Sequence, residues 1–95
     1  MAEVVIYTKH FCGYCTRAKQ LLTKKGVAFR EIDVSHDQKT RRWLAQVSGQ
    51  STVPQIFING QSVGGCDDIT ELDHDGELDP LLQAPAPPPP SRSRP

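Results

Sequence analysis

Apolar residues fall into short runs along this chain, and the spacing within the runs changes from place to place. Residues 4–7 read VVIY, an unbroken apolar run of the kind found in a strand buried on both faces. Between residues 13 and 25 the apolar positions instead recur near helical spacing, at Cys15, Ala18, Leu21 and Leu22. Gly26 then stands where a left-handed helix cap is favoured. The first predicted elements are therefore a strand and a helix.

The same two patterns alternate further along. Residues 28–34 predict a second strand, which the intervening helix makes parallel to the first through a right-handed crossover. A second helix follows, with Ser35 or Asp37 as its cap and Gly49 at its end. Its inward positions have the spacing i, i+3, i+4, i+7: Thr40, Trp43, Leu44 and Val47.

The last third of the chain predicts a hairpin and a helix. Residues 54–58 and 61–63 flank Asn59-Gly60, a pair typical of a tight type I′ turn. A third helix is expected from Cys66 or Asp67 to Gly76, with one final turn after it that packs Leu81 and Leu82. The order β-α-β-α-β-β-α around a four-stranded mixed sheet defines an α/β domain over residues 1–83.

Residues 84–95 differ in composition. Six of these twelve residues are prolines, which favours a polyproline II extension with no apolar face to bury. We expect a disordered tail, or else a ligand for an aromatic-lined groove.

Charge and hydropathy exclude several kinds of partner. Eleven basic and eleven acidic residues cancel, so no overall field favours nucleic acid or an anionic membrane surface. No apolar run reaches the ~20 residues of a membrane span, and the first residues lead into a strand rather than a secretion signal. A cytoplasmic protein is therefore expected. The basic residues concentrate in residues 1–42, where nine Lys or Arg face four acids, which suits an anionic small partner or a thiolate.

The chemistry of the chain centres on Cys12 and Cys15, at the junction of the first strand and helix. A structural zinc site normally needs four ligands, whereas the chain has three cysteines and three scattered histidines and no second Cys-x-x-Cys pair. No metal site is expected. A Cys-x-x-Cys pair between a buried strand and a helix is instead typical of a redox centre. The helix start and Lys9 favour a thiolate at Cys12, while Cys15 lies one turn further in.

Three separate stretches carry a resemblance to the glutaredoxin family, of the short bacterial type: VVIYTKHFCGYCTRAKQLL, STVPQIFINGQSVGGCDDI and GELDPLL. The resemblance covers residues 3–82. It implies a thioredoxin-like fold and a glutathione-dependent thiol-disulfide oxidoreductase that acts on protein–glutathione mixed disulfides and protein disulfides. Cys12 would be the nucleophile and Cys15 the resolving thiol, in a protein that is monomeric as an enzyme.

The resemblance also implies which residues bind glutathione. Pro54 would be a cis proline that leaves the backbone of Val53, after Thr52, free to pair with the peptide. Lys9 and Arg41 match positions that hold the glycine carboxylate, and Tyr14 matches the aromatic residue beside the active disulfide. The γ-glutamyl end would meet the helix start at three residues: Cys66, whose sulfur is expected to be non-catalytic, Asp67 and Asp68.

One position departs from the usual pattern. Gly13 stands where many family members have proline, and some glutaredoxins with a small residue there hold a [2Fe–2S] cluster between two protomers. In those proteins each first cysteine and two glutathiones supply the four thiolates. A cluster carrier that uses Cys12 in a dimer is therefore the alternative to a disulfide enzyme.

Overall fold

The computed structural model describes residues 2–86 and contains four strands and four helices. The strands are β1 (Val4–Thr8), β2 (Arg30–Asp33), β3 (Gln55–Ile58) and β4 (Gln61–Gly64). The helices are α1 (Gly13–Lys24), α2 (Gln38–Ser48), α3 (Cys66–His74) and α4 (Leu78–Gln83). The predicted order of elements is confirmed, and the last turn is extended to a six-residue helix. Most of the predicted tail, from residue 87 on, lies outside the described residues.

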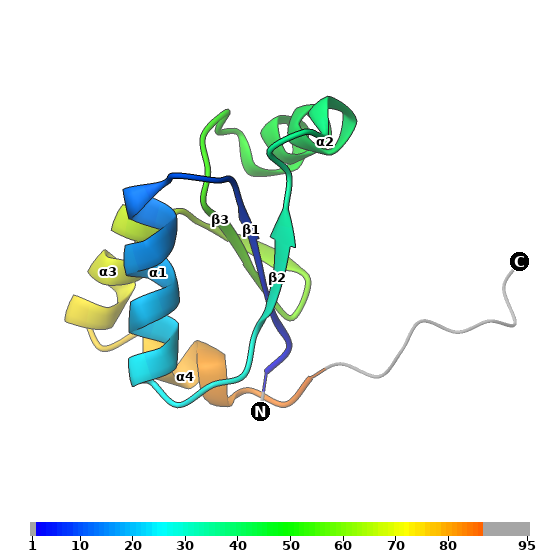
Figure 1. Ribbon diagram of the computed structural model, residues 1–95. Coiled ribbons are helices and arrows are strands. Elements are labelled where there is room, and N and C mark those ends of the chain that lie inside the picture. The colour runs from blue at the N-terminus through cyan, green and yellow to red at the C-terminus, as the bar shows by residue number, and fades with distance from the viewer. Residues whose placement is uncertain (1, 87–95) are drawn as a thin grey trace, which may run out of the picture.

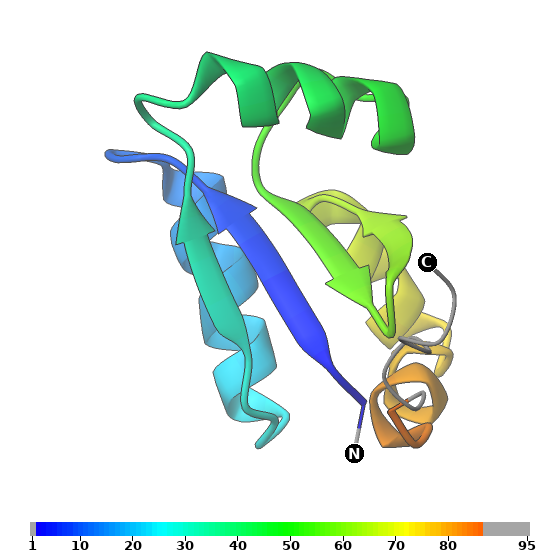
Figure 2. The same cartoon turned by 90° about the vertical axis from the view of Figure 1, so that its right-hand side faces the viewer.

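The four strands form one mixed sheet in the order β2-β1-β3-β4. β1 runs parallel to β2 and antiparallel to β3, and β3 pairs antiparallel with β4. Helices α1, α3 and α4 cover one face of this sheet, while α2 crosses the other face near the end of β1 (Figures 1 and 2). The expected thioredoxin-like α/β architecture is therefore confirmed.

Two apolar cores lie on the two faces of the sheet. The larger core joins alternate residues of β1 and β3 to α1, α3 and α4, and includes Val4, Ile6, Ala18, Leu22, Ile56, Ile58, Ile69, Leu78 and Leu82. The smaller core lies under α2 and comprises Val34, Leu44 and Phe57, with Val5, Tyr7, Ile32 and Val53 packed against it. β1 was expected to be buried on both faces, but Val5 and Tyr7 are only half-buried because α2 alone covers their face and crosses it near the end of β1 (Figure 2).

Trp43 belongs to this second face. Its ring stacks on Phe57 with a centroid distance of 5.8 Å and lies 5.8 Å from the ring of Tyr7. Trp43 was expected to face inward, and it packs on the smaller core but remains 43% exposed, so it lies at the rim of that core.

The turn between β3 and β4 has the predicted form. Ile58 pairs directly with Gln61, and both intervening residues have positive φ, 52° at Asn59 and 81° at Gly60. These are the angles of a type I′ turn. Asn59 also fixes the start of the chain, because its side-chain oxygen accepts the N–H of Glu3 at 2.9 Å.

Candidate functional site

The cysteine pair lies where β1 passes into α1. Cys12 is the N-cap of α1, in extended conformation (φ −118°, ψ 108°), and its sulfur accepts the backbone N–H of Cys15 at 3.2 Å. The first amides of a helix have no partner within the helix, so one of them can donate a hydrogen bond to the sulfur of the capping residue. The positive end of the helix dipole lies at the same place. This geometry stabilises negative charge on the sulfur of Cys12.

The two cysteines differ in exposure. Cys12 is partly exposed, whereas Cys15 is only 2% exposed and packs beneath it. The pKa of Cys15 is raised to about 12, mainly by burial and secondly by a hydrogen bond to Cys12. At neutral pH Cys15 therefore carries its proton.

Pro54 follows a cis peptide bond, as the family resemblance implied. Val53 precedes β3 and is thus outside the sheet ladder, and its carbonyl oxygen lies 3.9 Å from the sulfur of Cys12. The loop of residues 50–54 therefore brings a backbone edge beside the partly exposed thiol.

Two adjoining hollows flank this thiol, and they share Tyr14, Thr52 and Val53. The first, of about 430 Å³, is also lined by Gln50, Pro54, Gly65, Cys66, Asp67 and Asp68. The second, also of about 430 Å³, is completed by Lys9, Phe11, Cys12, Gly13, Arg41 and Ser51. The structure thus brings every residue expected to bind glutathione to these two adjoining hollows, which together are called the depression beside Cys12.

The acidic end of this depression is organised by Asp68. Its carboxylate accepts the N–H of Gly65 at 2.8 Å and so caps the start of α3. Gly64 has a φ of 101°, and a side chain there would collide with this carboxylate. Because Asp68 is committed to the cap and Asp67 is exposed, Asp67 is the freer of the two carboxylates expected to meet an ammonium group.

Cys66 contributes little accessible sulfur. It is 7% exposed and belongs to the larger apolar core, although it also borders the first hollow. Its surroundings fit the expected non-catalytic thiol.

Gln50 and Gln55, which no sequence pattern singled out, hold the loop of residues 50–54 in place. Gln55 is fully buried, and its amide group donates to the side chain of Gln50 at 2.8 Å and to the carbonyl of Thr52 at 3.0 Å. A polar residue inside an apolar strand, just after Val-Pro, is the sequence feature that could have indicated this role.

No helix among the described residues has both the length and the apolar character needed to cross a bilayer.

Comparison with known proteins agrees with this geometry. The glutaredoxin family model matches residues 4–63. The chain is 53% identical to glutaredoxin 3 of Escherichia coli (strain K12) over 83 residues, which cover 87% of this chain and all of that protein. Among solved structures, the glutaredoxin of Brucella melitensis is 49% identical with a TM-score of 0.79, over 87% of this chain and 90% of that one. A buckwheat glutaredoxin–glutathione complex is 37% identical with a TM-score of 0.81, over 85% and 76% of the two chains.

Proposed function

The chain belongs to the glutaredoxin family, a membership that supports a thiol-disulfide oxidoreductase role, and we propose that glutathione is its electron donor. The proposed substrates are protein–glutathione mixed disulfides and protein disulfides. One observation carries the proposal: the sulfur of Cys12 is partly exposed and receives a helix N–H, while Cys15 beneath it is buried and protonated.

The proposed reaction on a mixed disulfide uses Cys12 alone. Its thiolate attacks the glutathione sulfur, the bond between glutathione and the protein substrate breaks, and the substrate leaves as a thiolate that takes up a proton. A second glutathione thiolate then attacks the glutathione sulfur on Cys12. Oxidised glutathione is released and the Cys12 thiolate is restored.

A protein disulfide requires both cysteines. Cys12 attacks one substrate sulfur and forms a mixed disulfide, after which Cys15 attacks Cys12 and expels the reduced substrate. Two glutathiones then reduce the bond between Cys12 and Cys15. Formation of the mixed disulfide also removes the hydrogen bond and charge of Cys12 that raise the pKa of Cys15, so Cys15 becomes easier to deprotonate when it is needed.

The depression beside Cys12 suits glutathione in shape and charge. Lys9 and Arg41 provide cations at one end for the glycine carboxylate. The start of α3, with Asp67 and the backbone of Cys66, lies at the other end, where the γ-glutamyl carboxylate and ammonium are proposed to bind. Thr52 and Val53 lie between these ends, with Tyr14 at the rim. A buckwheat relative has been solved as a glutathione complex, which supports this assignment.

The cluster-carrier alternative depends on groups from outside one chain. A [2Fe–2S] cluster needs four thiolates, and within residues 2–86 no three His, Cys, Asp or Glu side chains lie together as a metal site. Cys15 and Cys66 are buried, which leaves Cys12 as the accessible thiol among the described residues. A cluster would therefore require a second copy of the chain and glutathione, as the resemblance implies.

Two serine variants and a spectrum test the proposal. Cys12→Ser should abolish the reduction of both substrate types, whereas Cys15→Ser should retain the reduction of glutathione mixed disulfides and lose that of protein disulfides. Activity retained in Cys12→Ser would refute Cys12 as the nucleophile. Protein purified without oxygen and with glutathione should be a colourless, active monomer, while a brown dimer of low activity would support the cluster carrier. We also propose the cytoplasm as the location of the protein, because the proposed reaction requires a pool of reduced glutathione.

A further inference from the structure

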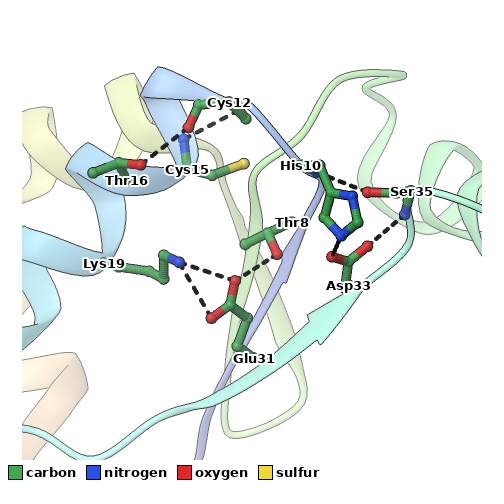
Figure 3. Close-up of polar contacts among 9 residues, drawn as sticks. All are labelled: Thr8, His10, Cys12, Cys15, Thr16, Lys19, Glu31, Asp33 and Ser35. Carbon is green, nitrogen blue, oxygen red and sulfur yellow. Dashed lines mark hydrogen bonds and ion pairs between the residues drawn. The ribbon is translucent and has the colours of Figure 1, made fainter.

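A third hollow adjoins the cysteine pair and is not used by the proposed glutathione site. It has a volume of about 390 Å³ and is bordered by both Cys12 and Cys15. Its titratable groups besides the cysteines are Lys9, His10, Lys19, Glu31 and Asp33, which come from α1, β2 and the connection between β1 and α1. Cys15 borders this hollow although it is buried, and Figure 3 shows it beside Cys12 at the start of α1.

Lys19 occupies a fixed position in this hollow. Its ammonium nitrogen lies 3.0 and 3.3 Å from the two carboxylate oxygens of Glu31. One of these oxygens also accepts the hydroxyl of Thr8 at 2.7 Å, and Thr8 is only 1% exposed (Figure 3). The Thr8 hydroxyl is the main cause that lowers the pKa of Glu31, with Lys19 adding to it, so the carboxylate stays ionised and holds the lysine.

The other charged groups of the hollow are engaged differently. His10 pairs with Asp33, with 2.7 Å between ring nitrogen and carboxylate oxygen, and Asp33 also accepts the N–H of Ser35. The side chain of Lys9 is exposed and also borders the glutathione depression. Two causes lower the pKa of Cys15 against burial and Cys12: first a hydrogen bond from the backbone of Lys9, then the side-chain charge of Lys19.

Resting on the proposed function, we propose that Lys19, positioned by Glu31 and Thr8, stabilises the Cys15 thiolate during closure of the active-site disulfide. In that step Cys15 releases its proton to water in the hollow. Its thiolate attacks the sulfur of Cys12 in the mixed disulfide, the bond between Cys12 and Cys15 forms, and the bond between Cys12 and the substrate breaks. The substrate leaves with the electron pair and is protonated by water. Lys19 therefore matters for the route that uses both cysteines and not for the route that uses Cys12 alone.

The test compares Lys19→Gln with Lys19→Arg and with Lys24→Gln, which removes the same charge from the exposed end of the same helix. Reduced protein is mixed with oxidised glutathione and quenched with acid at intervals. Mass spectrometry then separates the Cys12–glutathione adduct from the closed disulfide. The pH is varied, and the reduction of a glutathione mixed disulfide is measured on the same samples.

We expect Lys19→Gln to slow closure on the order of twofold to fourfold and to move the closure profile to higher pH, because less Cys15 thiolate forms without the cation. The adduct should accumulate, while Lys19→Arg and Lys24→Gln close like the wild type. Unchanged closure and pH profile in Lys19→Gln would overturn the inference, as would an equal loss of both reactions. A wild-type protein that fails to reduce the glutathione mixed disulfide would instead refute the proposed function.

Discussion

The backbone N–H of Cys15 points at the sulfur of Cys12, 3.2 Å away, so one cysteine caps the helix that carries the other. The pair is thereby made unequal by the fold. Cys12 receives a donor and remains partly exposed, whereas Cys15 is enclosed and keeps its proton to unusually high pH.

Stability should fall in alkali because of Cys15. Its pKa is raised from an ordinary value of 9.0 to about 12 in the folded chain, so between these values the folded state keeps a proton that the unfolded state has lost. This contribution is complete below pH about 9 and is lost as the pH rises toward 12, with a slope of at most about 1.4 kcal/mol per pH unit. Denaturant unfolding of reduced protein at several pH values measures it.

The control for this titration is Cys15→Ser, which removes the thiol and keeps the side chain small. Tyrosines and lysines also titrate in this range, but their effects are common to both proteins. The difference between the two unfolding free energies should shrink from pH 9 upward. Parallel curves would show that Cys15 titrates alike in the folded and unfolded chains.

Arg41 should act through glutathione binding. It borders the depression at the end proposed for the glycine carboxylate, whereas its neighbour Arg42 is exposed and lines only a shallow hollow beside it. Because an exposed ion pair contributes up to ~1 kcal/mol, Arg41→Ala should raise the KM for glutathione about two- to fivefold with little change in kcat. Arg42→Ala is the matched control, and an equal effect of the two variants would remove Arg41 from the site.

Gln55 should be important for the loop that carries Thr52, Val53 and Pro54. It is fully buried and donates from one amide group to both Gln50 and Thr52. Gln55→Leu fills a similar volume but removes both hydrogen bonds to the loop, each worth about 0.5–1.5 kcal/mol. The buried Oε1 of Gln55, which has no partner among the described residues, is removed as well and offsets part of this loss. Chemical denaturation should show this loss together with a higher KM for glutathione. A variant as stable as the wild type would mean that the loop is held by other contacts.

The strands, helices and cysteine junction could be predicted from the sequence because each depends on local patterns. The alternation around Asn59-Gly60 defines a turn, and the helical spacing after Cys12 defines a cap and a buried second cysteine. Interactions between distant segments had no such signal. Neither the ion pair of Lys19 with Glu31 nor the role of Gln55 follows from spacing, since both depend on how separate elements pack. The different roles of Asp67 and Asp68 likewise could not be predicted, because they depend on the hydrogen bond from the N–H of Gly65 to the carboxylate of Asp68.

Gly13 occupies the helix position where proline is most often found. It is the first residue of α1, where the N–H has no partner within the helix, and a side-chain carbon added there meets nothing within 4 Å. Cys12 already has the extended conformation that a following proline requires. Gly13→Pro should therefore raise the free energy of unfolding by about 0.4–1 kcal/mol, mainly because the unfolded chain loses freedom.

The same variant separates the two proposed chemistries. If the freedom of the Gly13 turn permits a shared cluster, wild-type protein purified without oxygen and with glutathione should absorb visible light and Gly13→Pro should not. Gly13→Ala controls for the loss of glycine without fixing the backbone angle. If all three proteins are colourless and reduce glutathione mixed disulfides, the helix start tolerates glycine in place of the usual proline without a change of chemistry. A Gly13→Pro protein less stable than the wild type would contradict the conformation described for Cys12 and Gly13.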